Sequence, residues 1–240
     1  MSKSAIEWTD ETWNPVTGCT KRSPGCKNCY AERFAKRLKA MGNEKYKDGF
    51  TVKMHWDRIE EPLSWRKPRI VFVNSMGDLF HEEVSLPFIK ACFEIMNEKR
   101  EHIFQILTKN ALRLSQVHQH LKWSENIWLG VSIENEDYCW RKDHLVKTEA
   151  KTKFISFEPL LESVKNCSLQ EIDWVIAGGE SGPGARPLKK QWLIEIRNKC
   201  LEEQIPFFFK QWGGPTSKAN GRELDGETWD QLPLSTMPSL

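Results

Sequence analysis

The sequence predicts an α/β fold, a (β/α) barrel or partial barrel of six to seven parallel strands that is TIM-barrel-like. From residue 70 onward, short apolar runs rich in β-branched and aromatic residues alternate with amphipathic stretches. Runs that are apolar on both faces are typical of parallel strands covered on each side. Polar residues such as Asn74, Glu158 and Lys210 follow these runs, where a (β/α) barrel builds its active site. An open doubly wound sheet is the alternative.

Each element has its own signal in the chain. An early strand is expected near residues 6–13, followed by a helix over 30–40. Ser85 is a plausible N-cap for a helix over 86–99, with Pro87 in its first turn. The further strands are expected at 70–73, 103–107, 127–131, 154–157, 174–177 and 206–209, and the further helices at 111–121, 138–146 and 189–201.

The chain is predicted to form one main domain with a short tail. Residues 1–214 are expected to make the barrel domain, with a surface excursion over 42–69 that holds the turn signals Gly42-Asn43 and Asp48-Gly49. Residues 215–240 contain few apolar side chains and two further turn signals. We therefore expect a hairpin-like tail without a core of its own.

Composition limits the classes of protein to which the chain can belong. Its 240 residues are 39% hydrophobic and 28% charged, and they contain no apolar run near the ~20 residues that span a bilayer. The first residues lack the apolar core of a signal peptide, so a cytoplasmic protein is expected. The 35 Lys and Arg against 33 Asp and Glu leave a net charge of only +2. A nucleic-acid partner would therefore need a local basic patch.

Three cysteines near the N-terminus are the most specific feature. Cys19, Cys26 and Cys29 have the pattern Cys-x6-Cys-x2-Cys, with nearby lysines and an arginine that are expected to favour thiolates. A structural zinc ion usually needs four protein ligands, and the next candidate, His55, lies more than 25 residues away. Three thiolates can instead hold a [4Fe-4S] cluster and leave one iron open. The other four cysteines are expected to be small buried side chains.

These features resemble the radical S-adenosylmethionine (radical SAM) superfamily, whose three-cysteine loop also ends in Cys-x2-Cys and an aromatic residue. The superfamily more often has three residues between its first two cysteines, where this chain has six. The segments WNPVTGC (13–19), NSMGDLF (74–80), SFEPL (156–160) and GGESG (178–182) resemble a phage-associated three-cysteine-motif family of unassigned function. That resemblance covers nearly the whole chain, and spore photoproduct lyase is a distant analogue.

The resemblance implies a [4Fe-4S] cluster and S-adenosylmethionine (SAM) as cofactors, with reduced flavodoxin or ferredoxin as electron donor. Asp78, after the second strand, would accept from the ammonium of SAM. A Gly-Gly-Glu element often does this in the superfamily after the second strand, but here it follows the sixth. The further acceptors for SAM would be Ser132, Glu134, Glu158 and Glu180. Cys139 would be a hydrogen-atom donor, with a buried structural thiol as its alternative.

A nucleic-acid base or nucleotide is the preferred substrate. Trp13 and Trp212 could stack on bases, whereas Trp128 and Trp174 are expected in the core. A basic helix face could contact phosphates, although a solvated face is the more common explanation. The candidate substrate residues are Trp13, Lys109, Lys210, Trp212, Arg33 and Arg37.

Three functions remain open from the sequence. The first is a radical SAM enzyme. The second is a metal- or cluster-containing nucleic-acid-binding protein without radical chemistry, and the third is a zinc-stabilised phage interaction protein. No membrane association is expected.

Overall fold

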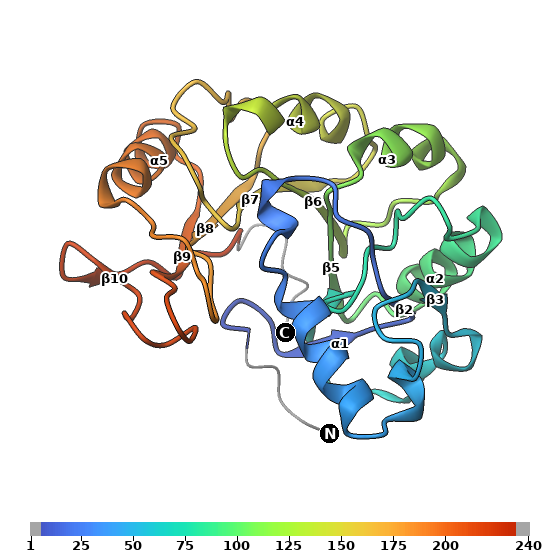
Figure 1. Ribbon diagram of the computed structural model, residues 1–240. Helices are drawn as coiled ribbons and strands as arrows, with labels where there is room; N and C mark the ends of the chain where they lie inside the picture. Colours follow the sequence, from blue (N-terminus) through green and yellow to red (C-terminus); the bar gives the residue numbers. More distant parts are fainter. Residues whose placement is uncertain (1–5, 234–240) are drawn as a thin grey trace.

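Seven parallel strands form one curled sheet, which makes a half barrel in the computed structural model (Figure 1). The prediction of a partial barrel is confirmed. Strands β1 and β9 are the two edges, and neighbouring strands pair in the order β1-β4-β5-β6-β7-β8-β9. The strands are β1 (Glu11–Trp13), β4 (Ile70–Val73), β5 (Ile103–Thr108), β6 (Ile127–Ser132), β7 (Thr152–Phe157), β8 (Trp174–Gly178) and β9 (Phe207–Gln211).

The structure describes residues 6–233. Parts of the predicted domain and tail, residues 1–5 and 234–240, lie outside the described residues. Four helices cover the convex face of the sheet, while the first helix lies on its open side (Figure 1). The helices are α1 (Tyr30–Ala40), α2 (Leu86–Glu98), α3 (Ala111–Val117), α4 (Trp140–Leu145) and α5 (Lys190–Glu202).

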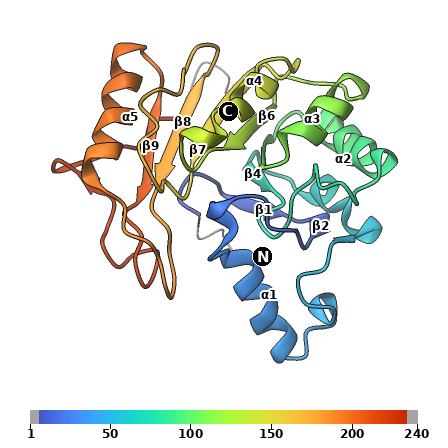
Figure 2. The same cartoon turned by 45° about the horizontal axis from the view of Figure 1, so that its top comes forward.

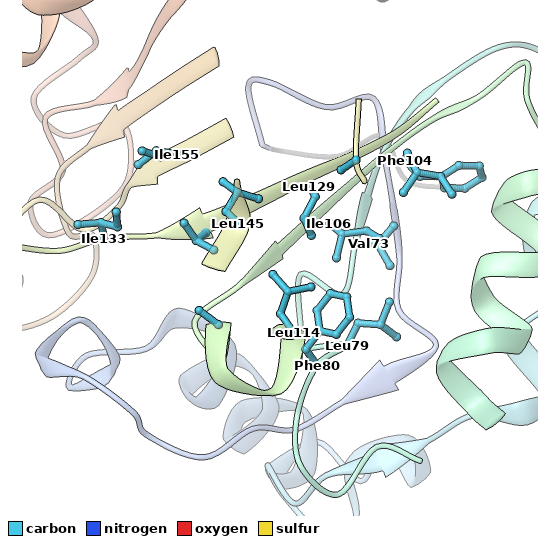
Figure 3. Packing of buried hydrophobic residues seen from close by; sticks show 14 of the residues in the cluster. Val73, Leu79, Phe80, Phe104, Ile106, Leu114, Leu129, Ile133, Leu145 and Ile155 are labelled. Carbon is cyan, nitrogen blue, oxygen red and sulfur yellow. The ribbon is translucent and has the colours of Figure 1, made fainter. Parts of the chain in front are cut away.

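The convex face of the sheet packs against these helices to form the main core (Figure 3). Alternate strand residues point to this face, because successive side chains of a strand point to opposite sides of the sheet. The strand residues Val73, Phe104, Ile106, Leu129 and Ile155 meet Leu114 of α3 and Leu145 of α4 in this core.

The concave face is filled by a second, aromatic layer. The ring of Trp174 lies edge-on to Trp8 at 6.2 Å and to Trp128 at 6.0 Å between centroids. Trp128 and Trp174 are fully buried, as expected. Phe72, Phe154 and Phe208 complete this layer. Apolar rings fill most of this part of the barrel, and the polar residues that line the cavity lie mainly at the carboxyl ends of the strands. Gln105, in the middle of β5, is a buried polar residue that donates to the Trp8 carbonyl oxygen at 3.5 Å.

The excursion and the tail contribute to two small two-stranded sheets that are separate from the main sheet. Strand β2 (Val16–Thr17) pairs antiparallel with β3 (Lys53–Met54), and β10 (Glu223–Leu224) forms a hairpin with β11 (Glu227–Thr228). Leu224 is buried in the main core. Ser85 precedes α2, but its hydroxyl makes no capping hydrogen bond. Short 3-10 helices are η1 (Pro24–Cys26), η2 (Glu44–Tyr46), η3 (Trp56–Arg58), η4 (Glu61–Ser64), η5 (His118–His120) and η6 (Glu136–Tyr138). No helix within residues 6–233 has the length and apolar character needed to cross a membrane.

Buried histidines make the stability of this fold dependent on pH. Burial, assisted by nearby Lys45, lowers the pKa of His55 from 6.5 to about 4, and burial also lowers the pKa of His81 and His102. Between these two values the unfolded chain binds more protons than the folded chain, so stability falls as the pH falls through this window. We expect His55 alone to remove about 2 kcal/mol of unfolding free energy at pH 5 relative to pH 7.5.

Urea unfolding at the two pH values measures this loss. The variant His55→Gln can still hydrogen-bond to Thr17, whose hydroxyl lies 2.8 Å from Nε2 of His55. It should lose less stability than the wild type over the same change of pH. An equal loss in both proteins would show that His55 does not contribute.

Candidate active site

The three N-terminal cysteines line one cavity at the carboxyl ends of the strands. Cys19, Cys26 and Cys29 have free thiols, are partly exposed, and border a cavity of about 450 Å³. Their loop leaves β2 through Gly18, whose φ of +85° favours glycine and where an added Cβ would lie 2.1 Å from the carbonyl oxygen of Thr51. A cavity of this size is typical of small-molecule and cofactor sites.

The charges around these thiols differ from the prediction. Lys21 pairs with Glu32 at 3.3 Å, and Arg22 pairs with Glu82, so both cations have carboxylate partners. Burial raises the pKa of the Cys19 thiol to about 12, with contributions from Asp78 and the other two cysteines. The expectation that the nearby cations lower the thiol pKa is therefore wrong for Cys19. A bound metal centre would have to supply the positive charge that keeps three thiolates together.

Glu180 anchors the cysteine loop from the carboxyl end of β8. Its two oxygens accept hydrogen bonds from the Arg186 guanidinium at 2.5 and 3.0 Å, from the Arg186 amide at 3.0 Å and from Asn28 at 2.9 Å. Burial raises the pKa of Glu180, but these hydrogen bonds outweigh it and leave the pKa below its ordinary value. Arg186 also donates to the carbonyl oxygen of Pro24 at 2.9 Å. Glu180 lines the cavity, but its acceptor positions are used within the protein.

Glu134 anchors the same loop from behind the cavity. It is fully buried and forms an ion pair at 3.0 Å with Arg141, which is also buried, and it accepts a hydrogen bond of 2.6 Å from Ser23. An added Cβ on Gly25 would lie only 2.5 Å from the Glu134 side chain. Glu134 is absent from the cavity lining. The structure thus places this predicted SAM ligand where it supports the loop.

Asp78 organises the ends of β4 and β5. Its carboxylate accepts from the hydroxyl of Thr108 at 2.8 and 2.9 Å, from the amide of Lys109 at 3.1 Å and from the amide of Phe80 at 2.9 Å. Asp78 is buried but borders the cavity beside Cys19. Three protein donors already share its oxygens.

Among the three strand-end carboxylates that line the cavity, Asp78, Glu158 and Glu180, Glu158 has the most remaining acceptor capacity. It accepts from Ser156 at 3.2 Å and lies 3.1 Å from the ammonium of Lys210. Lys109 donates to the Glu158 carbonyl oxygen at 3.4 Å, so two lysines flank this residue. Ser132, like these four residues, lines the cavity. The geometry brings together predicted residues from β5, β6, β7 and β9.

Other predicted residues lie away from the cavity lining. Trp13 is fully buried in the main core and donates from Nε1 to the Arg58 carbonyl oxygen at 2.9 Å. Trp212 packs on Phe209 and donates from Nε1 to the Glu223 carbonyl oxygen at 2.8 Å. None of the four residues Trp13, Trp212, Arg33 and Cys139 lines the cavity.

Arg33 and Cys139 have structural partners. Arg33 donates to the carbonyl oxygens of Ser181 at 2.5 Å and Pro183 at 3.1 Å, and it thereby ties α1 to the loop after β8. Cys139 forms a disulfide with Cys167, whereas the sequence predicted no disulfide for these two cysteines. Bound in this disulfide, Cys139 has no S–H to donate. Arg37 is exposed on α1.

Two amide side chains at strand ends, Asn74 and Gln211, also line the cavity, although the sequence predicted no individual role for either. Asn74 directly follows β4 with a φ of 62°, and its oxygen accepts from the Val16 amide at 3.0 Å. Gln211 donates to the Gly179 carbonyl oxygen at 3.0 Å. Within residues 6–233, Nδ2 of Asn74 and Oε1 of Gln211 are buried without a hydrogen-bond partner. Since unpaired buried polar atoms are costly, these atoms suit a polar ligand. The signal for both was their position at a strand end.

The donor set is compatible with an iron–sulfur cluster. No group of three His, Cys, Asp or Glu side chains within residues 6–233 is arranged to hold one ion. The ligands of a cubane need not converge on one point, because each thiolate binds a different iron. Three free thiols on one loop beside a cavity with a carboxylate, hydroxyls and lysines are therefore compatible with a [4Fe-4S] cluster and an adjacent polar cofactor.

Comparison with known proteins finds a family and two solved structures. The family model described as "Protein of unknown function (DUF5131)" matches residues 3–233. A search of the curated proteins found no match. Spore photoproduct lyase complexed with dinucleoside spore photoproduct has a TM-score of 0.47 and 11% identity, over 77% of this chain and 59% of that chain.

A mutant of spore photoproduct lyase with bound AdoMet and dinucleoside spore photoproduct has a TM-score of 0.46 and 10% identity, over 78% of this chain and 60% of that chain. The chain thus spans less than two thirds of the length of these structures. The predicted phage association is not tested by these matches and stays a prediction.

Proposed function

The chain belongs to the DUF5131 family of unknown function, and from its site we propose that it is a radical SAM enzyme acting on a nucleic-acid base or nucleotide. The observation that carries this proposal is the placement of three free thiols from one loop at the edge of a cavity whose rim holds polar side chains. Three cysteines leave one iron of a [4Fe-4S] cluster without a protein ligand. The cavity beside them has room for a small organic cofactor.

Cys19, Cys26 and Cys29 would hold the cluster. When reduced and with SAM bound, such a cluster would supply the one electron needed to cleave a C–S bond of the sulfonium into methionine and a 5′-deoxyadenosyl radical. The protein orients the cofactor and keeps water from the site. The apolar floor of the cavity, which includes Trp8 and Phe72, suits the second task.

Glu158 is the proposed acceptor for the ammonium group of SAM. Glu180 has its acceptor positions filled by Arg186 and Asn28, and Asp78 already accepts from three donors. Among the described residues, Ser156 and Lys210 are the partners of the Glu158 carboxylate. Ser132 and Ser156 are available for ribose hydroxyls, since both line the cavity.

Lys109 and Lys210 are proposed to bind an anionic part of the substrate. Both ammonium groups lie on the Glu158 side of the cavity, and each lysine side chain keeps about a fifth of its surface exposed. A nucleotide phosphate would satisfy two lysines more completely than one carboxylate does. The unpaired amide atoms of Asn74 and Gln211 would serve the polar edge of a base.

The test is anaerobic reconstitution with iron and sulfide, reduction with dithionite, and quantification of products by mass spectrometry. We expect 5′-deoxyadenosine and methionine in equal amounts, formed slowly without the true substrate. Glu158→Gln should weaken SAM binding by about 1–3 kcal/mol, the range for loss of a charged hydrogen bond. The exposed Glu162→Gln is its matched control and should bind SAM like the wild type.

A protein that carries its full cluster but neither binds nor cleaves SAM would overturn the enzymatic proposal. The second function predicted from the sequence, a cluster-bearing nucleic-acid-binding protein, would then remain. A protein that takes up one zinc ion and no cluster would instead support the third.

A further inference from the structure

The balanced total charge hides a strong local asymmetry. Residues 21–58, here called the α1 lobe, contain eleven Lys and Arg against four Asp and Glu, a net charge of +7. The whole chain carries only +2, so the rest of the protein carries −5. Figure 2 shows α1 and the segment after it extending away from the sheet. The molecule thus has one electropositive projection on an acidic body.

Helix α1 has an unusual distribution of side chains for a helix at a protein surface. It buries Ala31 and Ala35 against the protein, whereas Tyr30 and Phe34 keep 49% and 48% of their surface exposed. Large apolar side chains normally occupy the buried stripe of such a helix. Packing of the fold therefore does not account for these two exposed rings.

The exposed rings of Tyr30 and Phe34 lie on a helix that begins at the cavity edge. Tyr30 lines the cavity and donates from its hydroxyl to the Ser75 carbonyl oxygen, so this ring sits at the cavity edge. Phe34 lies one helical turn further on, and Arg37 and Met41 continue the same stripe, because residues three and four apart share a helix face. Met41 is 69% exposed. A stripe with rings and a cation therefore runs from the cavity edge along α1.

Several cations of the α1 lobe have no carboxylate partner in the described chain. Lys36 pairs with Glu32, and Arg33 bonds to carbonyl oxygens of the loop after β8. Within the part of the chain that the structure describes, no carboxylate within salt-bridge distance is found for several other cations of the α1 lobe. The exposed members of that set are Lys27, Arg37, Lys39, Lys47 and Lys53.

We propose that the α1 lobe binds a single-stranded nucleic acid and leads it to the cavity. Base stacking on exposed rings combined with backbone contacts to cations is how proteins bind single strands. The acidic remainder of the protein would repel a polyanion from other surfaces. A duplex would need a broader basic surface than one helix and its following segment provide. Binding of a single strand by the α1 lobe does not depend on the proposed function. The further conclusion that the reacting base is part of that strand rests on it.

Fluorescence anisotropy tests this with the cluster-loaded full chain. The probes are fluorescein-labelled oligothymidine and oligouridine of about 12 nucleotides, with an oligothymidine–oligoadenosine duplex for comparison. We expect binding to at least one single strand that weakens steeply between about 50 and 200 mM salt. The better of the two probes identifies DNA or RNA as the source.

Matched variants locate the binding surface. Phe34→Ala should weaken binding about 5- to 100-fold, the range for loss of one stacked base. Arg37→Glu/Lys39→Glu should also reduce the slope of log affinity against log salt by about 1 to 2. The control Lys90→Glu/Lys147→Glu makes the same change in net charge with exposed lysines on and near the convex-face helices, and it should bind like the wild type. Thermal melting and iron content check that each variant is folded and loaded.

Several results would overturn the inference. They are no binding of either single strand at about 50 mM salt, tighter binding of the duplex, and equal losses in the lobe and control variants. SAM cleavage without oligonucleotide binding would reject this inference and leave the proposed function intact. Oligonucleotide binding without SAM cleavage would do the reverse.

Discussion

Replacing any one of Cys19, Cys26 and Cys29 with Ala is expected to abolish cluster assembly and, with it, cleavage of SAM. The wild-type chain should take up about four irons on anaerobic reconstitution, as a cubane requires. Each variant loses one of three thiolate ligands, and the described cavity lining contains no further cysteine that could replace it. Iron and sulfide analysis with visible absorbance measures the loss.

Two other cysteines provide the controls. Cys92 and Cys200 are free but fully buried, and neither lines the cavity. Cys92→Ala and Cys200→Ala should leave iron content unchanged, although each loses some core packing. Loss of iron in either control, with the fold intact, would show that the proposed ligand set is wrong.

The loop that carries the three cysteines is held by two carboxylate–arginine pairs. Glu180 and Arg186 hold it at Asn28 and Pro24. Glu134, which is paired with Arg141, holds it by accepting a hydrogen bond from the Ser23 hydroxyl. Fixing the loop before a cofactor binds reduces the ordering cost of assembling the site. Two residues expected to bind SAM therefore have a more direct role in positioning the cysteines.

The sequence predicted the fold well because its signals are local. The strand β4 has the predicted limits, and the later predicted strands differ by one to two residues at their ends. The early strand, expected near residues 6–13, spans only Glu11–Trp13. Helices were less exact: the predicted helix over 111–121 ends as an α-helix at Val117 and continues as a 3-10 helix. Apolar periodicity identifies an element but does not define its last turn.

Several of the predicted site residues line the cavity and others do not, for a reason visible in the strand alternation. Glu158 and Lys210 line the cavity because they keep the two-residue alternation of the inward-facing Phe154 in β7 and Phe208 in β9. Trp13 pairs in register with Val73, whose side chain packs in the main core, so the tryptophan faces outward too. Contacts between distant segments, such as Glu134 with Ser23 or Cys139 with Cys167, have no local signal in the chain.

Replacing Glu134 with Ala should destabilise the protein by about 3–5 kcal/mol, the range for breaking a buried ion pair. The substitution leaves Arg141, which is only 1% exposed, with a buried charge and no carboxylate within salt-bridge distance in the described chain. It also removes the carboxylate that accepts the hydrogen bond of the Ser23 hydroxyl. The same carboxylate lies 3.7 Å from the ammonium of Lys109, and this ion pair is lost too. Iron content should fall as well, since Ser23 lies 3.7 Å from the Cys26 sulfur.

A double-mutant cycle separates this ion pair from simple loss of packing. Arg141→Met removes the buried charge, so the double variant Glu134→Ala/Arg141→Met should be more stable than Glu134→Ala alone. Urea unfolding gives the free energies of unfolding of the wild type, the two single variants and the double variant. The control is Glu149→Ala, an exposed residue in the segment after α4, which should change stability by less than about 0.5 kcal/mol. If the double variant is instead less stable than Glu134→Ala, Arg141 stabilises the fold through its contacts with Ser132 and Tyr138, and the ion pair is not what holds the loop.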